Sequence, residues 1–348
     1  MPRVMVAVSG GVDSAVAALL LKQQGHEICG VTIQTMPAAA AEPVWEDALD
    51  HARQICARLG IPHQTVDASA EFSARVINHF VSEYAVGRTP NPCVVCNPAI
   101  KWGCLLDHAA AQGYEYLATG HYARIEASAG RYRLLRGQDP DKDQSYMLYR
   151  LSQEQLARTL LPLGEHAKHE VRELAEANDL PVAARPESQD LCFIASEKHT
   201  DFLRDRIDFS PGPIVDVAGN NLGEHQGLAA YTVGQRKGLG IAAAEPLYVI
   251  RKDMANNALI VGPREAAFVR TCRLSQLNWV SVPPPDYGCE VAGQLEVRYR
   301  SSPVEAVLKV VGRKAVARLE SPRVCAPGQS AVLYDGEVLL GGGVIEPD

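Results

Sequence analysis

The sequence predicts an α/β protein with a parallel sheet covered by helices, followed by a small domain and a β-barrel. Four short apolar runs are typical of buried strands: 3–8, 27–33, 62–66 and 116–119. Helical patterns separate these runs, and strands that alternate with helices form a parallel sheet covered on both faces. After about residue 198, short alternating runs divided by Gly and Pro are typical of a small barrel. The clearest of these runs are 291–299, 304–311 and 331–334.

Segments with helical spacing fill the first half of the chain: 14–24, 44–59, 71–86, a helix ending near 112, 153–160 and 168–178. Residues 36–43 are rich in Ala and Pro, so we expect a loop there. Residues 88–98 contain three prolines, and we expect them to be irregular. Residues 131–136 predict one arm of a hairpin.

The composition is that of a globular protein with two or three domains. Of the 348 residues, 47% are hydrophobic and 22% are charged. No apolar run approaches the roughly 18–20 residues that span a bilayer, and the N-terminus lacks a signal peptide, so we expect a cytoplasmic protein without membrane contact. A net charge of -7 argues against non-specific coating of nucleic acid but allows a local basic face. Nine cysteines indicate thiol chemistry or metal ligation rather than a disulfide framework.

A glycine-rich segment, Ser-Gly-Gly-Val-Asp-Ser at 9–14, lies at the first strand-to-helix turn. Its glycines allow the backbone to approach a phosphate, and the N–H groups that open the helix bind the anion. Asp13 would repel a phosphate unless a divalent cation lies between them, so it indicates Mg²⁺. The segment lacks the lysine of a P-loop, and the alternative interpretation is a tight turn with incidental serines. The hexapeptide resembles the signature of the N-type ATP pyrophosphatases, which implies cleavage of ATP to AMP and pyrophosphate to activate a carbonyl oxygen.

Three cysteines predict the chemistry that follows. Cys93 and Cys96 form a C-x-x-C pair in the Pro-rich segment, and Cys192 follows much later. Such a pair can be a redox couple, half of a metal site or an activated thiolate. An adenylated carbonyl requires a nucleophile, and a cysteine that carries a terminal sulfur could deliver it while a second cysteine resolves the link by thiol–disulfide exchange. The other six cysteines are interpreted as small apolar residues: Cys29, Cys56, Cys104, Cys272, Cys289 and Cys325.

Further strings carry a specific resemblance. In chain order they are SGGVDS at 9–14, GRTPNPCVVCN at 87–97, TGHYAR at 119–124, DPDKDQSYMLYRLSQEQL at 139–156, RPESQDLCFI at 185–194, YTVGQRKGLGI at 231–241, VRYR at 297–300 and LYDGEVLLGGGVI at 333–345. The chain thereby resembles the bacterial tRNA-specific 2-thiouridylases, which make 2-thiouridine at the wobble position of tRNAs for Lys, Glu and Gln. The resemblance implies an ATP pyrophosphatase domain over 1–197, a small central domain over 198–267 and a C-terminal β-barrel over 268–348.

The resemblance also implies roles for single residues. Cys96 matches the nucleophile, Cys192 the persulfide carrier, and Asp13 belongs to the catalytic loop. The positions that match ATP contacts are Ala7, Val8, Ser9, Gly10, Gly11, Val12, Asp13, Ser14, Ile33 and Gly120. Those that match the target-base contacts are Asn91, Pro92 and Cys93. Those that match tRNA contacts are His121, Lys142, Asp143, Gln144, Arg298, Tyr299 and Gln329. Cations beside an aromatic ring, as at 298–300, suit phosphate contact and base stacking.

One position departs from the family pattern, because the family commonly has Asp where this chain has Cys93. Cys93, Cys96 and Cys192 could therefore ligate three irons of a [4Fe-4S] cluster and leave one iron open for sulfide. Zinc is a third interpretation, although a structural zinc site would require a fourth protein ligand. The persulfide route is the preferred interpretation. It implies a sulfur-relay donor protein, a reductant, and an enzyme that acts as a monomer.

Two rival functions remain at this level. Another ATP pyrophosphatase, such as an amidotransferase-type synthetase, would need an ammonia source, and no N-terminal Cys is available since residue 2 is Pro. A noncatalytic RNA- or metal-binding module would show no ATP turnover. Neither rival accounts for the loop and the cysteines together.

Overall fold

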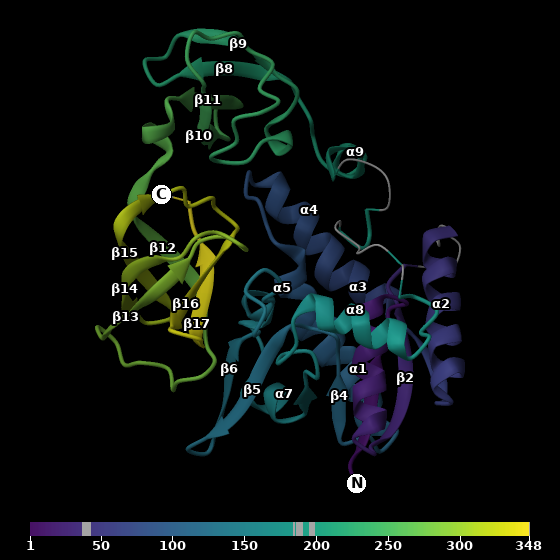
Figure 1. The fold of residues 1–348 in the computed structure, drawn as a ribbon. Helices are drawn as coiled ribbons and strands as arrows, with labels where there is room; N and C mark the ends of the chain where they lie inside the picture. Colours follow the sequence, from purple (N-terminus) through teal and green to yellow (C-terminus); the bar gives the residue numbers. More distant parts are fainter. Residues whose placement is uncertain (37–42, 184, 186–190, 195–198, 348) are drawn as a thin grey trace.

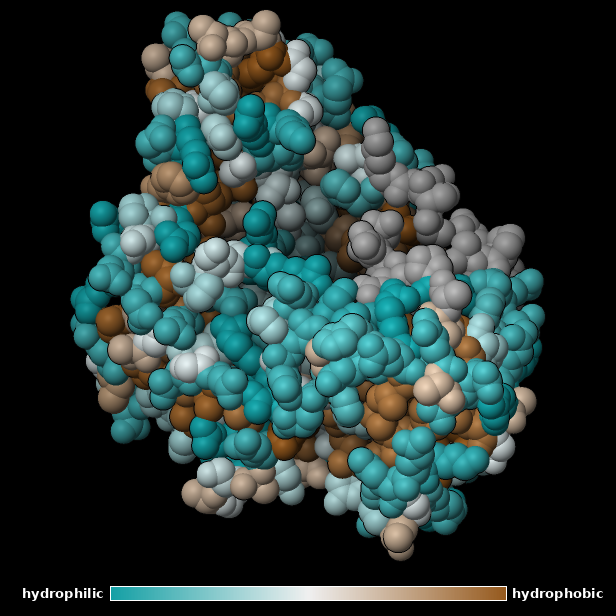
Figure 2. Space-filling model, viewed as in Figure 1, coloured by the Kyte–Doolittle hydropathy of each residue, from teal (hydrophilic) through white to brown (hydrophobic). Residues whose placement is uncertain are grey.

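The molecule consists of a helix-covered parallel sheet, a small central β domain and a β-barrel (Figure 1). The computed structural model describes residues 1–36, 43–183, 185, 191–194 and 199–347. Among these residues, no helix combines the length and apolar composition needed to cross a membrane. In the view of Figure 2 the surface is hollowed between the central domain, at the top, and the rest of the molecule.

The first sheet is parallel throughout, in the order β3-β2-β1-β4-β7. Its strands are β1 (Arg3–Ala7), β2 (Glu27–Gln34), β3 (His63–Asp67), β4 (Tyr116–Ala118) and β7 (Thr159–Leu160). One face packs against α1 (Val12–Gln23), α2 (Pro43–Leu59) and α8 (Lys168–Ala177). The other face packs against η3 (Asn97–Leu105) and α6 (Leu106–Ala111). Parallel strands buried on both faces confirm the predicted α/β class.

Further helices extend the first domain toward the central domain (Figure 1). They are α3 (Ser69–Phe72), η2 (Ser73–Ile77), α4 (Asn78–Ala85) and α9 (His199–Arg204). Their apolar side chains form a separate core with the residues around Cys192. This core fixes the position of Cys192.

The central domain is a four-stranded sheet in the order β10-β11-β8-β9. Its elements are β8 (Gly212–Asp216), β9 (Asn221–His225), η5 (Leu228–Ala230), β10 (Tyr248–Asp253), β11 (Ala258–Gly262) and η6 (Arg264–Ala267). It has its own apolar core around Ile214, Val249 and Leu259. The expected boundary between 197 and 198 involves residues 195–198, which lie outside the described part of the chain.

The last six strands close into an antiparallel barrel. They are β12 (Val269–Trp279), β13 (Glu290–Glu296), β14 (Val304–Val311), β15 (Lys314–Arg323), β16 (Ser330–Asp335) and β17 (Val338–Ile345). Their order is β12-β15-β14-β13-β16-β17, and pairing of β12 with β17 closes the ring. The alternating burial of β14 and β15 reflects one face toward the barrel core and one toward solvent. The predicted barrel is confirmed.

A hairpin from the first domain joins this barrel sheet. Its strands are β5 (Ala123–Ser128) and β6 (Arg131–Arg136), and β6 pairs with β17. The register places Leu134 opposite Leu339 and Leu135 opposite Val338. The sequence predicts the arm at 131–136, and the structure adds a partner about 200 residues further along the chain.

Two local predictions are wrong. The segment 88–98 is not irregular throughout, because α5 (Pro92–Cys96) forms within it and continues into η3. Pro92 is tolerated because it occupies the first turn, where its missing N–H would have no helical partner. The helix expected over 153–160 ends early, as α7 (Gln153–Ala157), because Thr159 and Leu160 join the sheet as β7. The expected loop at 36–43 falls mainly on residues 37–42, outside the described residues.

Candidate active site

The glycine-rich loop has the geometry of a phosphate-binding turn. Gly10 adopts φ +77°, and a Cβ there would collide with the carbonyl oxygen of Ala48 in α2. Ser9 N donates to Ser14 Oγ at 3.1 Å, and Ser14 Oγ donates to Gly11 O at 3.0 Å. These bonds hold the loop against the start of α1, where the first N–H groups of a helix lack helical partners and can bind an anion.

Asp13 is tied to two other parts of the first domain. Tyr122 OH donates to Asp13 Oδ1 at 2.7 Å, and Lys168 Nζ donates to the same oxygen at 2.6 Å. Gly120 packs against the backbone of this residue, because a Cβ there would lie 2.8 Å from Asp13 C. The loop is therefore braced by the segment that follows β4 and by the first residue of α8.

Asn91 positions the C-x-x-C pair by capping α5. Asn91 Oδ1 accepts the N–H of Cys93 at 3.1 Å, which satisfies one donor of the first turn. Val94 is 3% exposed and points into the core beneath the sheet, while Cys93 is exposed and Cys96 is partly buried. The short helix thus directs its apolar side inward and presents both thiols on another side.

Aromatic packing positions Cys192. The next residue, Phe193, lies with its ring centroid 5.7 Å from that of Phe72 and 5.3 Å from that of Phe80. Both contacts are edge-to-face, an arrangement that aromatic rings favour. The exposed thiol of Cys192 is therefore anchored to α3 and α4 through its neighbour in the chain.

The three thiols influence one another electrostatically. Loss of water around the sulfur raises the pKa of Cys96 to about 11, and a thiolate at Cys93 would raise it further. Loss of water likewise raises the pKa of Cys192 to about 12, with contributions from Cys96 and Cys93. Although Cys192 has exposed surface, its sulfur lies in a densely surrounded part of the molecule. The structure thus brings together the three cysteines that the sequence singled out.

Lys101 brings a positive charge close to the three cysteines. Its ammonium lowers the pKa of Cys93, Cys96 and Cys192, against the larger effect of desolvation. Lys101 Nζ lies 3.3 Å from His121 Nε2, and His121 Nδ1 lies 2.7 Å from Thr119 Oγ1. Burial, together with Lys101, holds the pKa of His121 well below its usual value. A neutral His121 accepts from Lys101 and donates to Thr119, which fixes its tautomer.

The residues expected to contact tRNA occupy two kinds of position. Arg298 is exposed on the barrel, and Lys142 is partly exposed. Tyr299 donates through its hydroxyl to Asp143 O at 3.2 Å, and it lies close enough to Cys93 for a thiolate there to raise its pKa, which burial raises most. His121 contacts Lys101, as described above. Tyr299 thus lies near Cys93, while Arg298 is exposed on the barrel.

Asp143, Gln144 and Gln329, also expected to contact tRNA, make contacts within the protein in this structure. The Asp143 carboxylate accepts from Arg136 Nη1 and from the backbone N–H of Gly137, both at 3.0 Å. Gln144 Oε1 accepts from Tyr122 N at 3.1 Å, and Gln329 Nε2 donates to the carbonyl oxygen of Thr89 at 2.7 Å. In this structure these side chains hold the site together.

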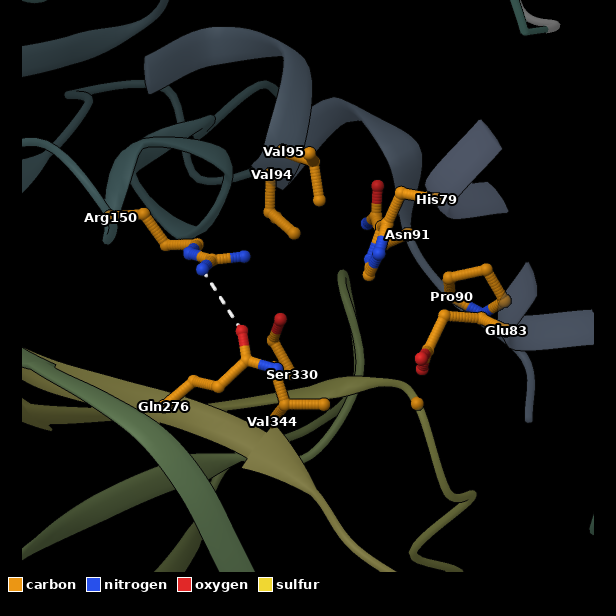
Figure 3. A pocket seen from close by; sticks show the side chains of 11 residues that line it. His79, Glu83, Pro90, Asn91, Val94, Val95, Arg150, Gln276, Ser330 and Val344 are labelled. Carbon is orange, nitrogen blue, oxygen red and sulfur yellow. Dashed lines mark hydrogen bonds between the residues drawn. The ribbon is translucent and has the colours of Figure 1, made fainter. Parts of the chain in front are cut away.

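The barrel and the cysteine segment meet at a narrow seam, which Figure 3 shows from close by. It encloses a cavity of about 10 Å³, lined by Asn91 and Val94 on one side and by Gln276 and Val344 on the other. Arg150 Nη2 crosses it and donates to Gln276 Oε1 at 3.0 Å. A cavity of this size holds about one water molecule, so the barrel packs closely against α5.

The iron–sulfur interpretation does not fit the arrangement of the described residues. Among them, no three His, Cys, Asp or Glu side chains form a group that could hold a metal ion. The three cysteines lie close enough to influence one another's pKa. A [4Fe-4S] cluster requires more, because it fixes the positions of its cysteine ligands. We therefore derive no step through a cluster.

Sequence reasoning missed Lys101, Tyr122 and Lys168. Lys101 and Tyr122 stand in or beside strings that carry the resemblance, but neither has a charge pattern or spacing that indicates a role. Lys168 contacts a residue 155 positions away, which no local pattern could indicate.

Comparison with known families places the fold and site in a class. A family model described as tRNA methyl transferase HUP domain matches residues 2–196. Models described as tRNA methyl transferase PRC-barrel domain and aminomethyltransferase beta-barrel domain match 200–263 and 269–345. The chain is thus a three-part protein whose first part is a nucleotide-binding HUP domain.

Full-length relatives narrow this class. A protein of Roseiflexus castenholzii named tRNA-specific 2-thiouridylase MnmA is 44% identical over 372 residues, and the match covers 100% of both chains. Proteins with the same name from Heliobacterium modesticaldum and Synechococcus sp. are 44% and 46% identical over 98% and 99% of this chain, and over 92% and 94% of their own. The chain belongs to the tRNA-specific 2-thiouridylase family.

Solved structures show a more distant likeness. A structure described as U34-tRNA thiolase NcsA from Methanococcus maripaludis with its [4Fe-4S] cluster is 18% identical, covers 59% of this chain and 63% of that chain, and has a TM-score of 0.36. A likeness this distant does not bear on the chemistry of this chain.

Proposed function

We propose that the protein is an ATP-dependent tRNA uridine 2-sulfurtransferase that converts the wobble uridine of tRNAs for Lys, Glu and Gln to 2-thiouridine. Its full-length relatives are named 2-thiouridylases, which supports this substrate. Two of the matching family models mention methyl transfer in their descriptions, but that reaction requires neither an adenylating loop nor a group of thiols. Both features serve sulfur transfer to an activated carbonyl.

One observation carries the proposal: residues 119–122 join the phosphate loop to the thiols. Gly120 and Tyr122 contact Asp13, while His121 contacts Lys101, whose charge acts on the sulfur atoms. Because the phosphate loop and Lys101 both contact residues 119–122, a carbonyl activated at the loop would lie near the sulfur that attacks it. Such proximity is a large part of catalysis in reactions between two groups.

The first step forms an adenylate. O2 of the uridine attacks the α-phosphorus of ATP, and the bond from that phosphorus to pyrophosphate breaks. The N–H groups at the start of α1 bind the phosphates, as the loop geometry requires. The oxygen on C2 then carries AMP, a good leaving group. A uridine in an anticodon loop can leave its stack at low cost to reach this site.

The second step transfers sulfur. Cys192 carries a persulfide, whose terminal sulfur attacks C2, and AMP leaves with the original oxygen. Cys96 then attacks the Sγ of Cys192, which forms a Cys96–Cys192 disulfide and releases the sulfur on C2 as 2-thiouridine. An external dithiol reduces the disulfide, and a sulfur-relay protein reloads Cys192. Electrons balance because the sulfane sulfur is reduced while two thiols are oxidised.

Mg²⁺ fits the donor set at Asp13. Both hydrogen bonds to its carboxylate reach Oδ1, so among the described contacts Oδ2 remains as a ligand. A divalent cation bound there would neutralise phosphate charge. Asp13 would thus hold the cation, while Ser9, Gly10 and Gly11 hold the phosphates.

We propose that tRNA crosses the face where the three domains meet. Arg298 and Lys142 reach backbone phosphates, and Tyr299 stacks on a base beside the thiols. Asp143 and Gln329 act by positioning their neighbours. The protein acts in the cytoplasm as a monomer.

The test replaces one thiol at a time. Cys192→Ser and Cys96→Ser should each abolish 2-thiouridine formation, measured by mass spectrometry of digested tRNA, because each thiol has a separate step. Pyrophosphate release should persist for one turnover in both variants, because adenylation precedes sulfur transfer. A single turnover of the unsubstituted protein should leave a Cys96–Cys192 disulfide, identified by peptide mapping.

Cys289→Ser is the matched control, because this thiol is exposed on the barrel and should be dispensable. A Cys192→Ser protein that thiolates tRNA at the normal rate contradicts the proposal. Iron and sulfide near one cluster per chain, in active protein purified without oxygen, would contradict the persulfide route alone.

A further inference from the structure

The proposed steps leave one buried cation beside the phosphate loop without a role. Lys168 is 8% exposed, and its ammonium lies 2.6 Å from Asp13 Oδ1. A buried lysine is costly unless it is paired, and Asp13 provides a pair in this structure. The loop at 9–14 contains no cation of its own.

The position of Lys168 is fixed by its helix. Its backbone N–H donates to Asp139 Oδ2 at 2.9 Å, and the preceding Ala167 N–H donates to Glu170 Oε2 at 2.7 Å. α8 packs across α1, with Val171 and Ala175 buried in the shared core (Figure 1). Lys168 is therefore held at the loop by a rigid element, as a ligand-binding cation should be.

We infer that Lys168 binds the phosphate chain of ATP and the pyrophosphate that leaves it, supplying from α8 the positive charge that the loop lacks. In this structure Asp13 neutralises this ammonium. When nucleotide enters with its divalent cation, Asp13 turns to the cation, and Lys168 donates to the phosphates, which carry more negative charge than one carboxylate. This inference rests on the proposed function only in taking the loop to be an ATP site.

The test measures binding, apart from turnover. Equilibrium dissociation constants of the full-length protein for ATP, inorganic pyrophosphate and adenosine should be measured by calorimetry. Lys168→Met should weaken ATP and pyrophosphate binding by about 10- to 100-fold, the effect of one charged hydrogen bond, with adenosine nearly unchanged. Lys168→Arg should restore much of the loss. His169→Ala, an exposed neighbour on the same helix, should bind like the unsubstituted protein.

A second comparison separates phosphate binding from support of Asp13. Tyr122→Phe removes the other donor to the same oxygen, so it should not reproduce the selective loss. Asp13→Asn and Asp13→Asn/Lys168→Met should be compared without divalent cation, because neither variant leaves an unpaired carboxylate. The double variant should bind ATP about 10-fold or more weakly than the single one.

Two results would overturn the inference. One is equal loss of adenosine and ATP affinity in Lys168→Met; the other is the same loss in Tyr122→Phe, because both assign Lys168 a purely structural role. If the unsubstituted protein binds adenosine as tightly as ATP, the loop is no ATP site, and the proposed function itself fails. If it prefers ATP and Lys168→Met keeps that preference, only the role of Lys168 is refuted.

Discussion

At the scale of single residues, the thiols lie in surroundings that disfavour their reactive form. Desolvation raises the pKa of Cys96 to about 11 and of Cys192 to about 12, so both are thiols at neutral pH in the free protein. Only the thiolate is a nucleophile. A thiol that stays protonated until a cation or a bound substrate lowers its pKa is protected from casual oxidation.

Lys101 should therefore control the reactivity of Cys96. Removal of its charge in Lys101→Met should raise the pKa of Cys96 further, since Lys101 now lowers it. At any pH below the pKa, alkylation by iodoacetamide should slow by about tenfold for each pKa unit gained. The measurement follows alkylation of Cys96 from pH 7 to 10 in a Cys93→Ser/Cys192→Ser background. Lys101→Arg, which keeps the charge, is the control, and an unchanged rate in Lys101→Met would refute the role.

At the scale of elements, α5 shows how a short helix survives in a Pro-rich segment. Pro92 fills a position that requires no N–H, and Asn91 satisfies the N–H of Cys93. Asn97 Nδ2 donates to Met147 O at 2.9 Å, which ties the end of the helix to η4 (Ser145–Leu148). The two thiols of the C-x-x-C pair depend on this cap for their orientation.

Loss of the cap should loosen the thiols before it unfolds the protein. Asn91→Ala should cost about 1 kcal/mol in the free energy of unfolding and increase hydrogen exchange in residues 92–96. Asn91→Asp keeps an accepting oxygen and should preserve the protection of these residues. Hydrogen exchange followed by mass spectrometry makes the comparison, and equal protection in Asn91→Ala and the native chain would show that the cap is dispensable.

The sequence predicted what local patterns determine. Strand and helix alternation, the turn at 9–14 and the strands of the barrel were all predictable, because each is marked by a pattern of neighbouring residues. The helix at 92–96 was missed because the three prolines of the segment indicated irregular structure, although Asn91 caps a helix there. Lys168 was missed for another reason. It contacts Asp13, which lies 155 residues away in the chain, and only the folded structure brings the two together.

At the scale of the whole molecule, a buried ionic group joins the hairpin to the barrel. Arg136 of β6 binds Asp143 at 3.0 Å and Glu296 of β13 at 2.6 Å, and its guanidinium lies 3.6 Å from the ring centroid of Tyr334. Tyr334 OH lies 3.1 Å from Ser145 Oγ, which completes the link to the segment 142–145. One cation thus connects the first domain to two barrel strands.

Arg136→Met should therefore destabilise the assembled molecule. It leaves two buried carboxylates without a cation, a change that costs about 3–5 kcal/mol when a buried ion pair loses one partner. Urea unfolding measures the loss. The variant that neutralises all three charges, Arg136→Met/Asp143→Asn/Glu296→Gln, should recover much of it. A loss below about 1 kcal/mol in Arg136→Met would show that the group contributes little.

The pairing of β6 with β17 has a consequence for how the chain is made. Residues 131–136 leave the ribosome about 200 residues before residues 338–345, which form their partner strand. At a synthesis rate of about 5–20 residues per second, the hairpin waits on the order of tens of seconds with one edge unpaired. An unpaired edge invites wrong partners, so nascent chains stalled in this window should be the most prone to aggregate. The hairpin edge thus gains its barrel partner only when translation nears its end.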